Sequence, residues 1–229
     1  MKFKPSYTSS IAEDIMAERL IRAQAVEFLA DAPMRLKSGL ISPVYVDNRK
    51  LFSHPEAWRD IVETMASRVE EYDLEFDIVA GVEAAGSMHA AALAYRLGLP
   101  AIMVRQKAKT YGNHSRIEGG DVKGMRVLLL EDHISTGLSC LDAIRALRGE
   151  GAQVRQVMSI TNYAIPETQR LFKQEGIDTY DVIAFEKVVR KAKEMGVIDD
   201  EHEKLVLEWL QTPWTWAAMH GVVASAIEN

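Results

Sequence analysis

The chain has 229 residues, of which 48% are apolar and 26% charged, and it contains a single cysteine. This composition excludes a disordered, collagen-like or disulfide-scaffold protein, and it supplies enough apolar side chains for one packed core. A formal net charge of −6 disfavours a nucleic-acid or membrane-surface binder. We therefore expect a single domain over residues 1–229, with no nucleic-acid partner and no membrane partner.

The cellular compartment is predicted from the cysteine and from the amino terminus. Cys140 has no second cysteine for an intrachain disulfide, and the first ten residues lack the apolar run of a signal peptide. Charged residues interrupt every apolar stretch before it reaches the roughly 20 residues needed to cross a bilayer. These features predict a cytoplasmic protein.

The first third of the chain predicts two helices and a short strand. Apolar residues follow helical spacing over residues 10–30, behind a serine that can cap the helix. Residues 43–46 predict a short strand. Residues 55–69 predict a second helix, with a proline in its first turn.

The middle of the chain alternates between apolar runs and helical patterns. Strands are predicted over residues 77–82, 101–105, 126–131 and 154–160, and helices over 86–97 and 139–148. Continuous apolar strands separated by helices are typical of a parallel sheet that is covered on both faces. The fold class is therefore α/β, with a doubly wound, mainly parallel sheet. Beyond residue 166 the pattern is helical, and tail tryptophans are expected to pack a helix onto the core.

The segment 127–139 contains the most informative polar residues. An apolar strand ends in two adjacent acids, Glu131 and Asp132, and the small-residue turn 135–137 then leads into a helix that begins near Ser139. Backbone N–H groups of such a turn, together with its hydroxyls, can hold a phosphate. The neighbouring carboxylates would repel that phosphate unless they face hydroxyl donors. The pattern therefore suggests a ribose 5-phosphate.

Residues 130–139 resemble the phosphoribosyl pyrophosphate (PRPP) motif of the type I phosphoribosyltransferases. Two further stretches resemble the orotate phosphoribosyltransferases. Residues 36–50 contain a Lys-Ser-Gly-x-x-Ser-Pro segment, and residues 104–112 with 117–119 are similar to the mobile catalytic loop of that family. The resemblance implies a type I phosphoribosyltransferase-like fold, with a core over about 55–165 and a small hood from about 1–50 and 166–229.

The resemblance also implies an activity. The enzyme would transfer the 5-phosphoribosyl group from PRPP to orotate and release orotidine 5-phosphate and pyrophosphate, in pyrimidine (UMP) biosynthesis. Mg²⁺ would bridge oxygens of pyrophosphate and ribose, so no metal ligand from the protein is required. The chain would form a homodimer in which the loop 105–118 reaches the neighbouring site.

Particular residues follow from the matching motifs. The implied catalytic residues are Lys109 and Asp132. The implied PRPP-binding residues are Lys37, Arg105, Lys107, Glu131, Asp132, Ser135, Thr136, Gly137 and Ser139. The implied base-binding residues are Lys37, Val44 and Tyr45, and residues 81–86 correspond to the pyrophosphate loop of the family.

Four positions depart from the family pattern. Gln106 replaces a second basic residue, Tyr111 replaces a histidine, and Leu138 replaces a glycine and would be strained if that position requires a positive φ. The stretch 159–166 lacks the arginine that clamps the orotate carboxylate in typical members. Two alternatives therefore stay open: a phosphoribosyltransferase for another base, or a catalytically weak regulator that senses PRPP or a nucleotide.

Other chemically capable side chains are expected to be structural. We interpret His89 as a satisfied core histidine. His114 and His133 could touch a ligand, and we favour reading both as exposed polar residues. Cys140 is expected to pack as a small apolar side chain in the first turn of its helix. Arg116 is a weaker candidate than Arg105 for contact with pyrophosphate.

Overall fold

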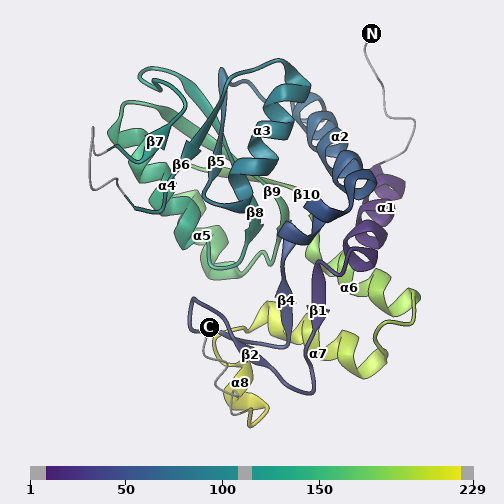
Figure 1. Ribbon diagram of the computed structural model, residues 1–229. Helices are drawn as coiled ribbons and strands as arrows, with labels where there is room; N and C mark the ends of the chain where they lie inside the picture. The colour runs from purple at the N-terminus through teal and green to yellow at the C-terminus, as the bar shows by residue number, and fades with distance from the viewer. Residues whose placement is uncertain (1–8, 108–114, 223–229) are drawn as a thin grey trace.

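A six-stranded sheet forms the centre of the computed structural model, which describes residues 9–107 and 115–222 (Figure 1). The strand order is β10-β9-β8-β5-β6-β7, and every neighbouring pair is parallel except the pair of β6 and β7. The strands are β5 (Ile78–Val82), β6 (Ala101–Val104), β7 (Ile117–Glu118), β8 (Arg126–Ile134), β9 (Gln153–Asn162) and β10 (Asp178–Ala184). The predicted α/β, doubly wound, mainly parallel sheet is confirmed.

Helices cover both faces of this sheet, and the apolar strands explain why. Along β8, Leu128 and Leu130 belong to the core cluster on one face, whereas Val127 and Leu129 belong to the cluster on the other. Because successive side chains of a strand point to opposite faces, a continuous apolar run needs cover on both sides. The helices that cover the sheet include α2 (Pro55–Glu71), α3 (Ala85–Leu97), α4 (Leu138–Gly149) and α5 (Pro166–Gln174).

A small hood of β1 to β4, α7 and α8 lies beyond the carboxyl ends of the central strands (Figure 1). Its strands form two antiparallel pairs, β1 with β4 and β2 with β3. Trp209 Nε1 donates a 2.8 Å hydrogen bond to the carbonyl of Ile41, which joins the two ends of the chain. The bounds are β1 (Val26–Phe28), β2 (Met34–Arg35), β3 (Ile41–Ser42), β4 (Val44–Val46), α7 (Asp200–Gln211) and α8 (Trp216–Met219).

The remaining elements connect the hood to the sheet. Helices α1 (Ser9–Arg22) and α6 (Phe185–Glu194) pack against each other and against β10, and the 3₁₀ helix η1 (Asn48–Ser53) follows β4. The tail tryptophans differ in burial: Trp209 and Trp216 are fully buried, whereas Trp214 is exposed. The expected packing of the tail is thus confirmed for two of them.

Three predicted boundaries differ from the structure. The helix expected over 10–30 ends at Arg22, because the next residues form β1 and pair with β4. Strand β8 continues to Ile134, past the expected end at residue 131. Strand β10 lies in the central sheet, so the core extends beyond residue 165 and includes part of the stretch assigned to the hood. Strand β10 is an edge strand, and its first half is polar and only partly buried. A search for continuous apolar runs therefore does not predict it.

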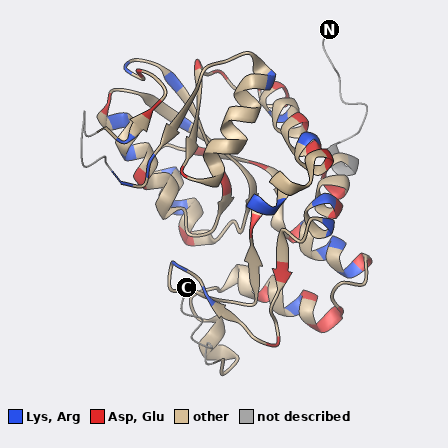
Figure 2. Cartoon of the chain, in the orientation of Figure 1, with Lys and Arg blue, Asp and Glu red and all other residues tan. Residues whose placement is uncertain are grey.

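Charges of both signs are interspersed over the helices, with long uncharged stretches in the sheet (Figure 2). Helix α3 is the exception, since it is uncharged from Ala85 to Tyr95. Among the helices described, none is long and apolar enough to span a bilayer.

Candidate functional site

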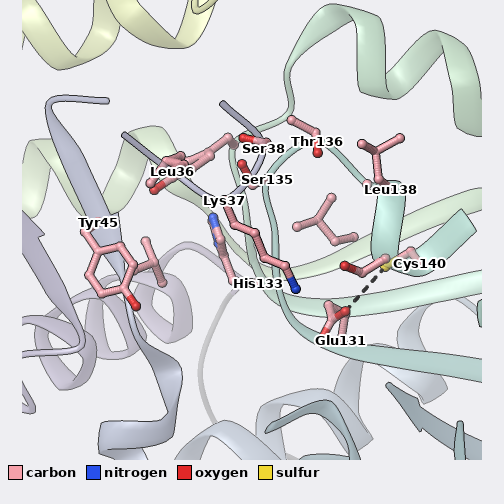
Figure 3. A pocket seen from close by; sticks show the side chains of 15 residues that line it. Leu36, Lys37, Ser38, Tyr45, Glu131, His133, Ser135, Thr136, Leu138 and Cys140 are labelled. Atoms are coloured by element: carbon pink, nitrogen blue, oxygen red, sulfur yellow. Dashed lines mark hydrogen bonds between the residues drawn. The ribbon is translucent and has the colours of Figure 1, made fainter. Parts of the chain in front are cut away.

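A cavity of about 320 Å³ lies between the carboxyl end of β8 and the hood (Figure 3). In doubly wound sheets, ligands bind at the carboxyl ends of the strands. Side chains from the hood and from the PRPP-like motif face each other across this space. The lining residues are Leu36, Lys37, Ser38, Tyr45, Val46, Glu131, His133, Ile134, Ser135, Thr136, Gly137, Leu138, Ser139, Cys140 and Tyr163.

The turn before α4 has the geometry of a phosphate cradle. Gly137 has a φ of 73°, and a Cβ there would lie 2.8 Å from Cγ2 of Thr168. No side chain caps the N-terminus of α4, so its first N–H groups remain available for an anion. The buried hydroxyl of Ser135 has no hydrogen-bond partner among the described residues. Ser135, Thr136, Gly137 and Ser139 therefore lie together as predicted, on the wall of the cavity.

Leu138 is not strained. The positive φ of this turn belongs to Gly137, whereas Leu138 is the first residue of α4 and its side chain is 60% exposed. A side chain at Leu138 therefore causes no backbone strain. The strain that was expected if this position required a positive φ is absent.

The two acids of the motif are held in contrasting positions. Glu131 is buried and lines the cavity, and burial together with the charge of Asp132 raises its pKa well above the usual range. Burial also raises the pKa of Asp132, which does not line the cavity and lies within electrostatic reach of Arg49. Lys37 extends across the cavity toward Glu131 in Figure 3. A buried carboxylate needs donors or a cation, and sugar hydroxyls beside a lysine supply both.

A second helix N-terminus adjoins the acids. The loop 81–86 packs so tightly that a Cβ at Gly81 would lie 2.4 Å from the Cα of Ser87, and one at Gly86 would lie 2.7 Å from the carbonyl oxygen of Leu130. The peptide bond between Glu83 and Ala84 is cis. No side chain caps α3, so its first N–H groups also remain available. Two uncapped helix N-termini thus lie on either side of the acidic pair.

The opposite wall of the cavity is aromatic. The Tyr163 hydroxyl donates a 3.3 Å hydrogen bond to the carbonyl of Val44, and its ring packs against His133 at 4.2 Å between centroids. Tyr163 lies in the stretch that lacks the arginine of typical members, and it ties the sheet to the hood. Tyr45 and Lys37, two of the three predicted base-binding residues, also line the cavity. The third, Val44, does not line it, and its side chain is fully buried in the core cluster.

His133 was predicted to be an exposed polar residue, and this is wrong. It is half-buried, lines the cavity, and lies 2.9 Å from the Thr161 hydroxyl through Nδ1. Burial lowers its pKa to about 3, so the ring is neutral at physiological pH. The available signal was the strand period: His133 lies two residues after Glu131, on the same face of a strand that continues to Ile134. Ser38 and Tyr163 line the cavity and were also missed.

Of the loop cations, the three that the structure describes, Arg105, Lys107 and Arg116, do not line this cavity. Arg105 follows β6 and forms a 2.9 Å ion pair with Glu118, and Lys107 is exposed. Arg116 pairs with Asp142 of α4 at 2.5 Å and donates to the carbonyl of Arg105, so it braces the base of the loop. Lys109, Tyr111 and His114 lie outside the described residues.

The expected structural roles of two other residues are confirmed. His89 is buried and accepts a 3.0 Å hydrogen bond from Trp58 Nε1, and burial lowers its pKa to about 3. Its core position is as predicted, but only one ring nitrogen is satisfied, since Nε2 has no hydrogen-bond partner among the described residues. Cys140 is buried at the start of α4, where burial raises the pKa of its thiol well above the usual value.

Comparisons with known proteins agree with this geometry. Residues 47–194 match the phosphoribosyl transferase domain family. The chain is 40% identical to an orotate phosphoribosyltransferase of Coxiella burnetii, over 88% of this chain and 96% of that protein. The crystal structure of orotate phosphoribosyltransferase from Aeropyrum pernix is similar with a TM-score of 0.68 and 26% identity, over 80% of this chain and 99% of that one. The Mycobacterium tuberculosis H37Rv orotate phosphoribosyltransferase in complex with PRPP has a TM-score of 0.60 and 26% identity, over 77% and 98%. The chain therefore belongs to the orotate phosphoribosyltransferase family.

Proposed function

We propose that the cavity between the sheet and the hood is where this chain transfers the 5-phosphoribosyl group of PRPP to orotate, releasing orotidine 5-phosphate and pyrophosphate in pyrimidine biosynthesis. One observation carries the assignment: buried Glu131, followed by half-buried Asp132, lies between two uncapped helix N-termini. PRPP has the complementary order of groups. Its ribose hydroxyls suit Glu131 and Asp132, its 5-phosphate suits the turn before α4, and its pyrophosphate suits the start of α3.

The mechanism follows from the movement of charge. Orotate N1 attacks C1 of the ribose, the bond from C1 to the pyrophosphate oxygen breaks, and the leaving group takes the electron pair. The ribose becomes oxocarbenium-like while negative charge grows on pyrophosphate. N–H groups and cations that bind pyrophosphate more tightly at that moment lower the barrier. Lys37 faces Glu131 across the cavity, and Lys109 and Lys107 are the loop cations assigned to pyrophosphate.

Mg²⁺ fits the residues present. Glu131 and Asp132 form a buried pair of like charges whose pKa values are raised, and a nearby cation would favour their ionised forms. Among the described residues, no group of three or more His, Cys, Asp or Glu side chains could hold a metal. We therefore expect Mg²⁺ to be held by oxygens of PRPP and water, with this acidic pair nearby. When bound, it would neutralise charge on the pyrophosphate.

The base half of the site is built differently from that of typical members. The stretch 159–166 lacks the carboxylate-clamping arginine and instead places Tyr163 on the cavity wall, where Lys37 and Tyr45 are the assigned base-side residues. A lysine can pair with the orotate carboxylate, and an aromatic ring can pack against a flat base. The substituted arginine is also the observation that favours the second candidate, transfer to a base other than orotate.

A homodimer is part of the proposal, and α3 supplies its support. Met88, Ala91 and Tyr95 recur at helical spacing on the exposed side of α3, and Tyr95 is 91% exposed. An exposed apolar stripe on an uncharged helix face suits a second copy of the chain. The loop 105–118 follows β6 and would reach the neighbouring site. Tyr95→Glu should shift the protein to monomers in light scattering, whereas unchanged dimers would place the interface elsewhere. A cytoplasmic location completes the proposal.

A base panel is the decisive experiment. Purified protein is incubated with PRPP and Mg²⁺ and with orotate, uracil, adenine, guanine or hypoxanthine, and pyrophosphate release is measured. Orotate consumption with stoichiometric pyrophosphate is expected. Turnover of another base in place of orotate would establish the second candidate, and PRPP binding without any turnover would establish a sensing regulator.

Lys109→Ala tests the loop assignment. It should lower kcat sharply and leave the Kd for PRPP largely unchanged, because the loop cation acts mainly on the charge that grows on the leaving group. Wild-type kcat in this variant would remove Lys109 from the mechanism.

A further inference from the structure

We propose that Glu83 and Gln106 form a two-bond clasp that positions the loop 81–86, and with it the first N–H groups of α3, for pyrophosphate. The proposal rests on the function proposed above and adds two positioning residues to it. Gln106 is the residue that replaces a basic side chain of the family pattern. In this chain its contacts are to the protein itself.

The clasp consists of two hydrogen bonds, and Gln106 is the donor in both. The backbone N–H of Gln106 donates to Glu83 Oε2 at 3.0 Å, and Gln106 Nε2 donates to the carbonyl of Glu83 at 3.1 Å. The backbone N–H of Glu83 also donates to the carbonyl of Val104 at 2.9 Å. Backbone N–H, carbonyl and carboxylate of Glu83 are thus all bonded to the carboxyl end of β6 and the residues that follow it.

This arrangement fixes the loop immediately before α3. Gln106 Nε2 bonds the carbonyl of Glu83, the residue directly before Ala84. Ala84 is the N-cap residue of α3, and no side chain caps this helix. At the far side of the loop, Ser87 Oγ donates to the carbonyl of Gly81 at 3.1 Å. The loop is therefore held at both ends, which limits the directions in which its remaining N–H groups point. Fixed N–H groups stabilise developing negative charge without reorganising during the reaction.

The clasp also holds the position of a negative charge. The Glu83 carboxylate lies in the loop assigned to an anionic group, and a mobile carboxylate there would oppose pyrophosphate binding. Its hydrogen bond to the Gln106 N–H keeps it on the β6 side. The family's basic residue is thus replaced by a residue that orients the loop.

The variants separate the two halves of the clasp. Glu83→Ala removes the carboxylate acceptor, and Glu83→Gln restores an acceptor oxygen without charge. Gln106→Ala removes the side-chain donor. Two matched controls lie outside the clasp. Gln153→Ala, at the amino end of β9, removes an exposed glutamine that donates to the Gly124 carbonyl, and Asp121→Ala, between β7 and β8, removes an acid that accepts the Lys123 N–H.

The measurements are KM and kcat in both directions of the reaction, and the Kd for PRPP by calorimetry in the absence of base. Glu83→Ala and Gln106→Ala should each raise the KM for PRPP, the KM for pyrophosphate and the Kd for PRPP by about 3- to 10-fold, the effect of one lost hydrogen bond. The KM for orotate and for orotidine 5-phosphate should change less than about 2-fold. Glu83→Gln should be closer to wild type than Glu83→Ala, and both controls should behave as wild type.

Two results would overturn the clasp. One is an unchanged Kd for PRPP in both clasp variants. The other is an equal rise in KM for all four substrates, which a general loss of structure would cause. Failure of the proposed function is a separate result: wild-type protein would then not turn over orotate, and the PRPP calorimetry would still decide the clasp.

Discussion

Asn48 donates a 2.7 Å hydrogen bond from its side-chain amide to the backbone carbonyl of Asp132. Because a carbonyl can only accept, the atom of Asn48 that faces it must be the NH₂ group. The same nitrogen lies 3.1 Å from the Thr161 hydroxyl, which in turn lies 2.9 Å from Nδ1 of His133. The start of η1, the second acid of the PRPP motif and the base-side histidine are therefore joined by one buried polar chain.

Substitution of Asn48 should weaken both stability and PRPP binding. Asn48 is fully buried, so Asn48→Ala leaves the Asp132 carbonyl short of a donor and lowers the free energy of unfolding by about 1–3 kcal/mol. Asn48→Asp should cost more, because it places an oxygen against that carbonyl. Urea unfolding and PRPP calorimetry measure the two effects. An unfolding free energy equal to wild type in Asn48→Asp would contradict the assignment.

Glu131→Gln should stabilise the protein without ligand and abolish tight PRPP binding. The pKa of Glu131 is higher in the folded than in the unfolded protein, so the free energy of unfolding falls as pH rises above the ordinary carboxyl range. The amide of Glu131→Gln does not ionise, so it removes this pH-dependent loss of unfolding free energy. Its Tm should therefore exceed the wild-type value at pH 8 and by a smaller margin at pH 5. PRPP affinity should fall at least about tenfold, the loss of a charged acceptor.

The control for this substitution is Glu201→Gln, since Glu201 is exposed on α7. It should leave both the Tm profile and the PRPP affinity unchanged. A gain in Tm for Glu131→Gln that is equally large at both pH values would show that the buried charge is not its source.

Gly137 and Leu138 should respond in opposite ways to substitution. Gly137→Ala places a methyl group 2.8 Å from Thr168 Cγ2 at a positive φ, so it should destabilise the protein by about 1–3 kcal/mol and weaken PRPP binding. Leu138→Gly, which restores the usual family residue, should change stability by less than about 1 kcal/mol, because Leu138 is exposed and helical. Thermal unfolding of the two variants compares them directly, and a larger loss in Leu138→Gly would refute the assignment of the turn.

An arginine introduced at Tyr163, in the stretch that lacks the family arginine, should destabilise the protein. The Tyr163 ring is buried between His133, Phe185 and Trp209, and Tyr163→Arg would bury an unpaired guanidinium there, at a cost of about 3–5 kcal/mol. Tyr163→Phe loses the bond to the Val44 carbonyl and should cost about 1 kcal/mol. Urea unfolding checks both. An arginine variant as stable as wild type would show that the cavity wall can repack around a charge.

Much of the central sheet could be predicted from the sequence, because β5 and residues 127–130 of β8 are buried and continuously apolar, and β9 has an apolar, buried centre. The edge strand β10 could not, since its first residues are polar and half-buried. Residues 26–28 continue the apolar spacing of the first helix, and only their pairing with β4 makes them a strand. Pairing partners distant in the chain are not visible in a local pattern.

The phosphate half of the site could also be predicted from the sequence, whereas the base half could not. Its phosphate half lies on one continuous segment, so the adjacency of Ser135, Gly137 and Glu131 was visible in the sequence. Its base half depends on contacts between distant residues. Val44 is buried by the core cluster while Tyr45 faces the cavity, and His133 is covered by Tyr163 from the next strand. Such burial is decided by neighbours that no spacing rule supplies.

The hood joins segments that the ribosome makes at opposite ends of synthesis. The bond from Trp209 to Ile41 spans 168 positions, whereas the sheet strands β5, β6, β8 and β9 are complete by residue 162. During translation the cradle for the sugar phosphate can therefore assemble before the wall that covers the base. A growing chain that has not yet exposed Trp209 lacks the bond that ties β3 to α7, so the hood is the last part of the cavity wall to be fixed in place.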